Sequence, residues 1–258
     1  MSVFAPPSAG PSVPLLEAVD VSRAFGGVRA NQGITLRLER GEIRGLIGPN
    51  GAGKTTLTNV LSGIYPPQSG DVRLDGASLV GLTPMQISRR GLLRTFQTPK
   101  LFGSMTVEDN LLLPALARSP LLGRSHQRRA RERAEELLEL TRLGRLRRLT
   151  ARSLSGGEQA LLQVATGFMV DDLRCYLLDE PFAGINPVLK ERIIELIRHE
   201  NRTHGTTFLV ISHEMATVRQ LCARVSVLAE GRLLTEGTMD EISADPAVIS
   251  AYLGKGGA

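Results

Sequence analysis

The sequence predicts an α/β protein with a mainly parallel core sheet. Apolar runs of strand character alternate with helical stretches along most of the chain, the pattern of strand–helix–strand units. A glycine-rich loop joins one of these strands to the helix that follows it. A helix-rich stretch interrupts the alternation between about residues 83 and 161, where no strand is expected, and predicts a helical insertion.

The N-terminal third has mostly strand character. Short β-like stretches lie between residues 15 and 39, and Asn31-Gln32-Gly33 is expected to separate two of them. A strand candidate at 42–47 runs into the glycine-rich loop, and apolar residues then recur at helical spacing over residues 57–61. The stretch DVRLDG at residues 71–76 predicts a further strand that ends in a turn.

The alternation resumes after the helical insertion. A strand is expected at residues 175–178 and another at 206–212. Between them, Asn186 and Pro187 are suited to the N-cap and first turn of a helix that extends to about residue 202. A short helix, the hairpin RVSVLAEGRLLTEG and the helix-like DEISADPAVISAYLG complete the predicted elements.

Composition places the chain among ordinary globular proteins. Hydrophobic residues make up 42% and charged residues 22% of the 258 positions, which excludes a fibrous or wholly disordered protein. A membrane-spanning helix needs roughly 20 consecutive apolar residues, whereas the best run, Leu111 to Ala117, contains Pro114. Cys175 and Cys222 have no paired spacing, so no disulfide or zinc framework is expected. The proline-rich start, without Lys or Arg, predicts a flexible tail and a cytoplasmic protein.

The excess positive charge is concentrated in one segment. The net charge is +5, but residues 118–152 alone hold eleven Arg and four Glu, a local balance of +7. The ordinary explanation is a solvated helix face, because the glutamates stand at neighbour spacings from the arginines. The alternatives are attraction to anionic lipid or to acidic loops of a partner. Nucleic acid is not expected, because the segment has no aromatic residue on which bases stack.

A phosphate-binding loop follows the strand at 42–47. Residues 48–55, GPNGAGKT, match the pattern G-x-x-x-x-G-K-[ST] in full, between a strand and a helix. The glycines let successive N–H groups converge on a phosphate, and the helix adds its positive N-terminal end. Lys54 is expected to reach the β- and γ-phosphates, and the Thr55 hydroxyl to ligate Mg²⁺. The predicted phosphate-binding set is Gly48, Pro49, Asn50, Gly51, Ala52, Gly53, Lys54, Thr55 and Thr56.

Two acids end the strand at 175–178. Charges at the end of an apolar strand are costly unless they meet a cation. Asp179 is expected to support Mg²⁺, directly or through water, and Glu180 to polarise the attacking water. Taken alone, the Asp-Glu pair is more typical of a surface turn, and the phosphate loop upstream is what favours catalysis.

A third motif identifies a family. LSGGE occupies residues 154–158, just before the Asp-Glu strand, and His213 follows the next strand. This order of motifs resembles the ATP-binding subunits of ABC transporters. The resemblance implies the ABC ATPase variant of the P-loop NTPase fold, with a mainly parallel core sheet, an N-terminal antiparallel β subdomain and an inserted α-helical subdomain. It implies one domain over residues 15–254, with tails at 1–14 and 255–258.

The resemblance also implies roles for single residues. Phe25 stands where the family has an aromatic that stacks on adenine, although a lone Phe is more often a core residue. Gln97, in RTFQ, corresponds to the glutamine that contacts Mg²⁺ and the attacking water. His213 corresponds to the histidine that grips the γ-phosphate, and residues 183–186, AGIN, to a loop that crosses a dimer interface. The implied catalytic set is Glu180, His213 and Gln97, and the implied metal set is Thr55, Gln97 and Asp179.

In this family the LSGGE motif acts on nucleotide held by the opposite subunit. The implied trans set is Ser155, Gly156, Gly157 and Glu158. A serine and glycines at a helix start suit an anion site. Two subunits would therefore sandwich two ATP molecules head to tail. ATP, Mg²⁺ and a second ATPase subunit, identical or different, are expected.

Three stretches narrow the subgroup: RTFQTPKLFGSMTVEDN, EPFAGINP and the ending DPAVISAYLG. Together they resemble the ATPase subunits of branched-chain amino-acid importers and their urea and amide relatives. The implied function is a motor subunit on the cytoplasmic face of the inner membrane, partnered by permease subunits and indirectly by a solute-binding protein. Leu101, Phe102, Met105 and Val107 lie where the family receives a permease helix, with core packing as the alternative.

The sequence also allows alternative functions, and some of its residues differ from the usual family pattern. Lipopolysaccharide-export ATPases share much of the pattern, including EPFAG. A soluble ABC-type ATPase acting on nucleic acid commonly carries two cassettes, whereas this chain has one, and a non-hydrolysing regulator does not need Glu180 and His213. Ala160-Leu161-Leu162, Gly167-Phe168-Met169 and Asn186 depart from the usual family residues, without touching the groups that do chemistry.

Overall fold

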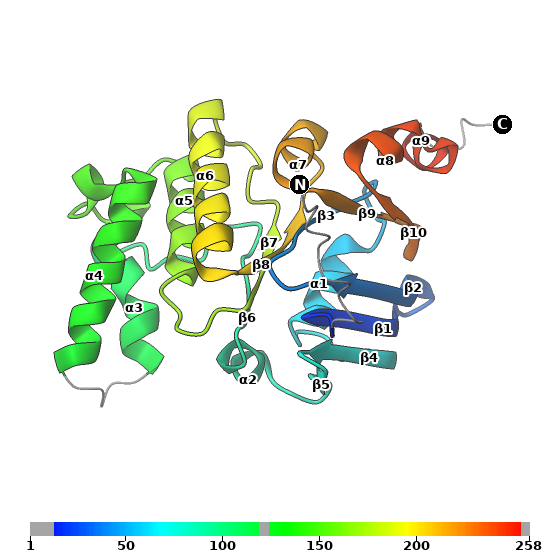
Figure 1. Ribbon diagram of the computed structural model, residues 1–258, viewed down its shortest axis with the longest axis horizontal. Coiled ribbons are helices and arrows are strands. Elements are labelled where there is room, and N and C mark those ends of the chain that lie inside the picture. The colour runs from blue at the N-terminus through cyan, green and yellow to red at the C-terminus, as the bar shows by residue number, and fades with distance from the viewer. Residues whose placement is uncertain (1–12, 119–123, 254–258) are drawn as a thin grey trace, which may run out of the picture.

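The computed structural model describes residues 13–118 and 124–253, and every structural statement below concerns these ranges. Two β-sheets organise it (Figure 1). A four-stranded antiparallel sheet has the order β2-β1-β4-β5, and a six-stranded sheet has the order β10-β9-β3-β8-β7-β6. The strands are β1 Leu16–Phe25, β2 Val28–Leu38, β3 Ile43–Ile47, β4 Ser69–Leu74, β5 Ala77–Ser78, β6 Leu92–Arg94, β7 Cys175–Asp179, β8 Thr207–Ile211, β9 Arg224–Ala229 and β10 Arg232–Gly237.

The six-stranded sheet is mainly parallel, as predicted. Strands β3, β6, β7, β8 and β9 pair in parallel, and β10 closes one edge as an antiparallel hairpin with β9. The α-helices are α1 Lys54–Leu61, α2 Pro84–Arg89, α3 Val107–Arg118, α4 Arg124–Thr141, α5 Gly156–Gly167, α6 Pro187–His204, α7 Met215–Leu221, α8 Met239–Ala244 and α9 Pro246–Leu253.

The six-stranded sheet separates two hydrophobic cores. Successive side chains of a strand point to opposite faces. Tyr176 and Leu178 on β7 belong to the core shared with α5 and α6, whereas Cys175 and Leu177 belong to the core shared with α1, β1 and β2. Both faces of β7 are therefore buried, which explains its uninterrupted apolar sequence.

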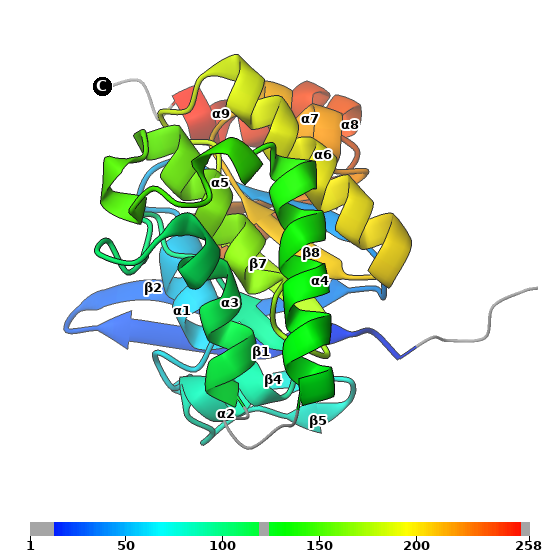
Figure 2. The same ribbon diagram turned by 90° about the vertical axis from the view of Figure 1, so that its left-hand side faces the viewer.

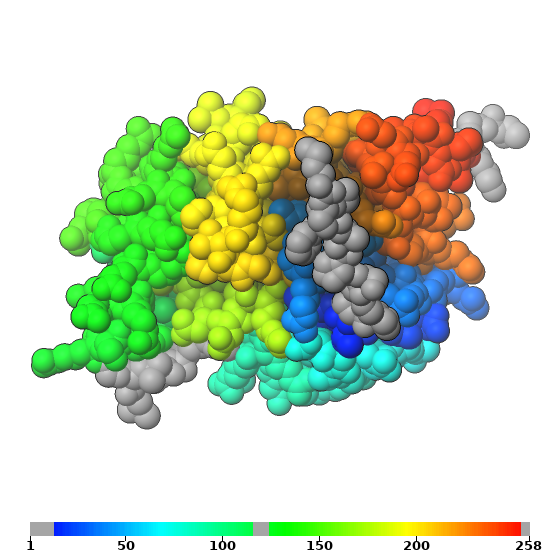
Figure 3. Space-filling model, in the orientation of Figure 1, coloured from blue at the N-terminus to red at the C-terminus, as the bar shows by residue number. Residues whose placement is uncertain are grey.

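Helices α3, α4 and α5 form a lobe beside the sheet, named here the helical lobe. Helix α4 packs on α3, α5 and α6, and Figure 2 views this lobe with α3 and α4 toward the reader. In the space-filling view, α4 (green) and α6 (yellow) lie against each other along one face (Figure 3). The rest of the molecule, including α6 and both sheets, is called the core lobe.

Two expectations about strands are wrong. Asn31-Gln32-Gly33 lies inside β2, where the register with β1 shifts between the pairs Arg23–Asn31 and Val21–Ile34. The positive φ of Gly33, 59°, fits this β-bulge, so the glycine bends the strand and does not end it. Strand β6 lies within the stretch expected to contain no strands. With three residues it is too short to give a periodic signal.

Tyr176 fills the space beside Gly167. A Cβ at Gly167 would lie 2.2 Å from the Tyr176 hydroxyl oxygen. Tyr176 is buried, with its ring 5.4 Å from that of Phe168, and burial raises the pKa of its hydroxyl. The departure from an alanine-rich run at 167–169 therefore has a packing cause.

The arginine-rich segment is partly neutralised by ion pairs. Arg128 pairs with Glu132, and Arg147 contacts both Glu108 and Glu135. This supports the ordinary interpretation of a solvated, salt-bridged helix face. Among the described helices, none is both long and apolar enough to cross a bilayer.

Candidate functional site

The phosphate loop curls between β3 and α1 in a shape that requires glycine. Gly53 is the N-cap of α1 with φ 97°, and a Cβ there would lie 2.2 Å from the carbonyl oxygen of Ala30. A Cβ on Gly48 would lie 2.1 Å from the carbonyl oxygen of Leu228. The loop is thus held against β2 and β9, and no larger residue fits at either position.

A cavity of about 550 Å³ opens in front of this loop. It brings together, from separate parts of the chain, five of the residues to which the sequence assigned chemistry: Lys54, Thr55, Gln97, Asp179 and Glu180. Of the remaining predicted phosphate-binding residues, Asn50, Gly51, Ala52, Gly53 and Thr56 also line it.

The cavity wall also contains residues that the sequence reasoning missed. They come from β2 and its start, from the end of β8 and from the β9–β10 turn, and they are Val28, Arg29, Ala30, Ile211, Glu230 and Gly231. The Gly231 amide donates a hydrogen bond to the Ala52 carbonyl at 3.1 Å, and the Asn31 side chain donates to the Gly53 carbonyl at 3.1 Å. Gly231 and Asn31 are distant in sequence from the phosphate loop, and no local sequence pattern marks them as its hydrogen-bond partners.

Lys54 folds over the phosphate loop. Its Nζ donates to the carbonyl oxygens of Gly48 at 2.7 Å and Pro49 at 3.0 Å. Burial lowers the pKa of Lys54, while the charges of Glu180 and Asp179 act in the opposite direction. The ammonium group is therefore a cation held between loop carbonyls and two acids, which suits a phosphate ligand.

Asp179 forms a buried ion pair that the sequence did not predict. Arg94 Nη2 lies 2.7 Å from Asp179 Oδ2, and the two side chains are only 7% and 5% exposed. Arg94 also donates to the Asn59 side chain, and the Asp179 amide donates to Thr95 Oγ1 at 2.9 Å. The cation that a buried carboxylate needs is thus supplied by β6, the strand that the sequence did not reveal.

Glu180 has an unusual backbone conformation. Its φ is 50°, in the left-handed region that non-glycine residues seldom adopt. Its amide donates to the Ile211 carbonyl at 2.9 Å, which fixes it beside the end of β8. His213 Nδ1 lies 2.9 Å from Glu180 Oε2, so two of the three predicted catalytic residues are neighbours, although the His213 side chain is 60% exposed.

The donor set around the cavity fits magnesium. Thr55, Gln97 and Asp179 offer a hydroxyl, an amide and a carboxylate oxygen along the same cavity. Mg²⁺ prefers oxygen ligands and keeps several waters, so few protein ligands suffice. Within the described residues, no group of three or more His, Cys, Asp or Glu is arranged to hold a metal.

The LSGGE segment lies apart from the cavity. Ser155 caps α5 in a reciprocal capping box: Ser155 Oγ accepts from the Glu158 amide at 3.3 Å, and the Glu158 carboxylate accepts from the Ser155 amide at 2.9 Å. These contacts lower the pKa of Glu158. Ser155 and Gly156 are exposed, and none of the four trans residues lines the phosphate cavity.

Phe25 is a surface residue at the end of β1. It is 40% exposed, its ring lies 5.2 Å from that of Tyr65, and the Arg23 guanidinium lies 4.9 Å from it. It is not a core residue, and it does not line the cavity in front of the phosphate loop.

The apolar residues at 101–107 have mixed surroundings. Val107 is fully buried in the core shared with α5 and α6, and Leu101 packs against that core. Phe102 is exposed, and Met105 is half-buried. Phe102 is thus the large apolar side chain that this stretch presents to solvent.

Comparisons with known proteins agree with this geometry. Residues 31–183 match the family described as ABC transporter, and residues 232–258 match the family described as branched-chain amino acid ATP-binding cassette transporter. The chain is 38% identical over 255 residues to BraF of Pseudomonas aeruginosa, and 40% identical over 257 residues to LivG of Escherichia coli K12. Both are described as high-affinity branched-chain amino acid transport ATP-binding proteins, and each match covers 95% of this chain and 99% of the relative.

Solved structures give the same result for the fold. The ADP conformation of MJ1267, an ATP-binding cassette of an ABC transporter, matches with a TM-score of 0.80 and 28% sequence identity. The match covers 95% of this chain and 100% of that one. The overall fold described above is therefore shared with an ATP-binding cassette of known structure.

Proposed function

This chain belongs to the ABC transporter ATP-binding family, and on that basis we propose that it is the ATP-hydrolysing subunit of a branched-chain amino-acid importer. The main support for the proposal is sequence identity. Along nearly its whole length, the chain is 38–40% identical to relatives described as branched-chain amino acid transport ATP-binding proteins. The match of residues 232–258 to a branched-chain-specific family adds an independent segment. The transported solute is assigned by this kinship, since the ATPase site contacts only nucleotide.

In this proposal the phosphate loop binds the triphosphate of ATP. Backbone N–H groups of the phosphate loop and of the first turn of α1 bind the phosphates, and Lys54 exchanges its loop carbonyl contacts for phosphate oxygens. Phe25 provides the stacking surface for adenine, supported by its exposed ring at the end of β1. Thr55, Gln97 and Asp179 would hold Mg²⁺, which would neutralise charge on the phosphate oxygens.

Hydrolysis requires a positioned base. Glu180 accepts a proton from the attacking water, and the 2.9 Å contact with His213 Nδ1 orients its carboxylate. His213 then contacts the γ-phosphate with the part of its ring turned to solvent. Gln97 lines the same cavity and contributes to positioning the water.

The second half of each site comes from a second ATPase subunit. This is supported by the separation of Ser155, Gly156, Gly157 and Glu158 from the cavity, combined with the exposure of Ser155 and Gly156 at the start of α5. A helix N-terminus with free amides attracts the γ-phosphate of the opposite subunit. ATP binding therefore closes a head-to-tail dimer, and hydrolysis removes the group that holds it closed.

The proposed partners are membrane permease subunits and, through them, a solute-binding protein. The protein then lies peripherally on the cytoplasmic face of the membrane. The exposed Phe102 is the proposed contact of this lobe with a permease helix. No nucleic-acid partner is proposed.

Uptake by the reconstituted transporter tests this function. The chain is co-purified with the permease and solute-binding protein found with it, and ATP-dependent uptake of labelled leucine into proteoliposomes is measured. We expect uptake with the wild-type chain and none with Glu180→Gln, which keeps the fold and removes the base. ATP-dependent movement of a lipid, with no uptake of leucine, isoleucine or valine, would overturn the import proposal.

A further inference from the structure

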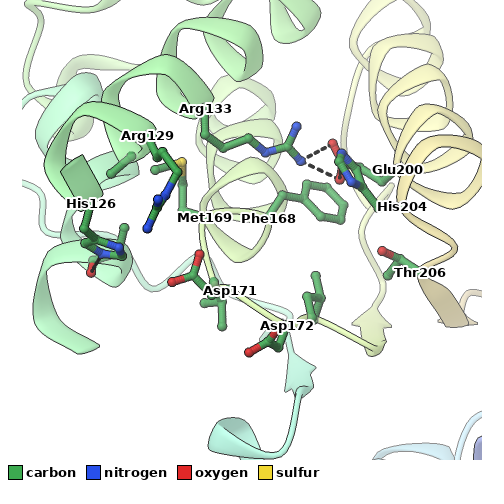
Figure 4. Close-up of a pocket in the computed structure, with 14 residues that line it drawn as sticks. His126, Arg129, Arg133, Phe168, Met169, Asp171, Asp172, Glu200, His204 and Thr206 are labelled. Atoms are coloured by element: carbon green, nitrogen blue, oxygen red, sulfur yellow. Dashed lines mark hydrogen bonds and ion pairs between the residues drawn. The ribbon is translucent and has the colours of Figure 1, made fainter. Parts of the chain in front are cut away.

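A second cavity lies between the helical lobe and the core lobe, away from the phosphate loop (Figure 4). Its volume is about 410 Å³. Helices α3 and α4 form one side, and α6 with the segment that follows α5 forms the other. It shares no lining residue with the cavity in front of the phosphate loop.

The cavity has an apolar wall of well-packed side chains. Phe168 and Met169 follow α5, and Ala115 and Ala130 come from α3 and α4. All four are buried, so this wall is fixed by the core behind it. An aliphatic group of a few carbon atoms fits against such a surface.

One charged pair in the cavity is already satisfied. Arg133 Nη2 donates to both oxygens of Glu200 at 2.5 Å, and Glu200 is almost completely buried. Arg133 also pairs with Glu136 at 2.7 Å. These contacts join α4 to α6 across the two lobes, and they leave Arg133 and Glu200 neutral as a pair.

Charged side chains of both signs also line the cavity. Arg129 comes from α4 and Asp172 follows α5, and both are exposed. His126, also on α4, is buried, with its Nε2 3.2 Å from the Ala115 carbonyl oxygen. Figure 4 shows Arg129 extending from α4 toward the side of the cavity where His126 and Asp171 lie. Arg129 and Asp172 carry opposite charges at this cavity, so a ligand with one group of each sign finds an opposite charge for both groups.

We propose that this cavity binds a small zwitterionic amino acid with an aliphatic side chain. Its carboxylate pairs with Arg129, and His126 is another residue of α4 that lines the cavity. Its ammonium group pairs with Asp172, and its side chain packs on Phe168 and Met169. The ligand class follows from the charges and the apolar wall of this cavity and does not depend on the proposed transport function.

Such a ligand would connect two helices of the helical lobe. It contacts α4 on one side and the C-terminal end of α5 on the other, where Phe168 is the C-cap. Helix α5 begins at the Ser155 cap and has 12 residues, or about 18 Å at 1.5 Å per residue. An occupant of the cavity therefore restrains the helix that carries the LSGGE segment.

Binding of L-leucine to the purified full-length chain, followed by calorimetry and by thermal melting, tests the proposal. Two probes remove one charge each: 4-methylpentanoate lacks the ammonium group, and 3-methylbutylamine lacks the carboxylate. We expect saturable binding of leucine that raises the melting temperature, and binding by each analogue that is weaker by about tenfold or more. Equal binding of the three compounds, or no saturation by leucine at about 10 mM, would overturn the proposal.

Substitutions locate the site. Arg129→Gln and Asp172→Asn should each weaken leucine binding by about tenfold. Asp172 has φ 58°, and asparagine tolerates this left-handed conformation, so Asp172→Asn is expected to fold. Arg131→Gln is the matched control, because Arg131 is exposed on the same helix and does not line the cavity. Wild-type affinity in both cavity variants would contradict the assignment, whatever the result of the separate uptake experiment.

Discussion

Glu180 and His213 make two contacts through a single carboxylate oxygen. Glu180 Oε2 lies 2.9 Å from His213 Nδ1 and accepts from the His213 amide at 3.4 Å. Because both contacts engage Oε2, the orientation of the carboxylate depends on the short turn after β8. The left-handed backbone of Glu180 is part of the same arrangement, since its amide is tied to the carbonyl of Ile211 at the end of β8.

Glu180→Gln should bind ATP and hydrolyse it at least about a hundredfold more slowly. The amide has nearly the same shape as the carboxylate but does not accept a proton, and general-base catalysis typically contributes 10²- to 10⁴-fold. Phosphate release measures the turnover, and light scattering with and without Mg-ATP measures the mass. We expect the ATP-bound variant to double in mass. Unchanged turnover would show that Glu180 is not the base.

Lys54→Ala should weaken nucleotide binding by about ten- to a hundredfold. A charge-assisted hydrogen bond is worth roughly 1.5–3 kcal/mol, and the variant removes the one supplied by Nζ. Titration with a fluorescent ATP analogue measures the affinity. Lys100→Ala is the control, because Lys100 is exposed and does not line the cavity. Equal affinities for the two variants would exclude Lys54 as a phosphate ligand.

Ser155→Arg should leave ATP binding by the monomer intact and abolish hydrolysis. Ser155 lies outside the cavity of its own subunit, so the bulky cation obstructs only the γ-phosphate of a partner. ATP affinity and turnover are measured on the same preparation. Ser153→Arg serves as the control, since Ser153 is also exposed but precedes the motif. Full activity of Ser155→Arg would refute the head-to-tail arrangement.

Arg94→Met should destabilise the fold by about 3–5 kcal/mol. It leaves the buried carboxylate of Asp179 without its cation, which is the costly way to break a buried pair. Urea unfolding measures the loss, and Arg128→Met, which removes an exposed pair with Glu132, should cost under about 0.5 kcal/mol. The double variant Arg94→Met/Asp179→Asn should recover part of the stability. A loss no larger than that of Arg128→Met would show that the pair is dispensable.

The capping box of α5 should make stability depend on acid pH. Hydrogen bonds from Ser155 lower the pKa of Glu158, so its stabilising contribution is complete above the usual glutamate range, about pH 4. It is lost as the pH falls through the lower pKa of the folded state. Glu158→Gln lacks this titration, so the stability difference between wild type and variant should shrink below about pH 4. Unfolding midpoints between pH 3 and 7 provide the measurement, and a constant difference would contradict the assignment.

Local motifs allowed much of the architecture to be predicted from sequence. The phosphate loop, the β9–β10 hairpin and the Asn186 cap of α6 each depend on neighbouring residues, and the structure contains all three. The order of strands and helices around them led to the parallel sheet. Lys54 and Glu180 both follow the carboxyl ends of parallel strands. Because such ends lie at the same edge of a sheet, the strand order also accounts for their meeting in one cavity.

What the sequence did not reveal depends on contacts between distant residues. Arg94 and Asp179 are 85 positions apart, and Gly231 supports the phosphate loop through a hydrogen bond to Ala52. Neither contact has a spacing or composition that a single sequence displays. Strand β6 was missed for a related reason: its three residues acquire strand character only by pairing with β7.

The contact between Gly167 and Tyr176 means that substitutions at these two positions depend on each other. Alanine at 167 would place its methyl group where the phenol oxygen lies, and a smaller residue at 176 would leave a hole beside Phe168 and Phe208. Either substitution alone would lower the stability of the fold. The two substitutions together could restore complementary packing between positions 167 and 176. In descendants of this chain, glycine at 167 and tyrosine at 176 should therefore be retained or replaced jointly, even though neither touches ATP.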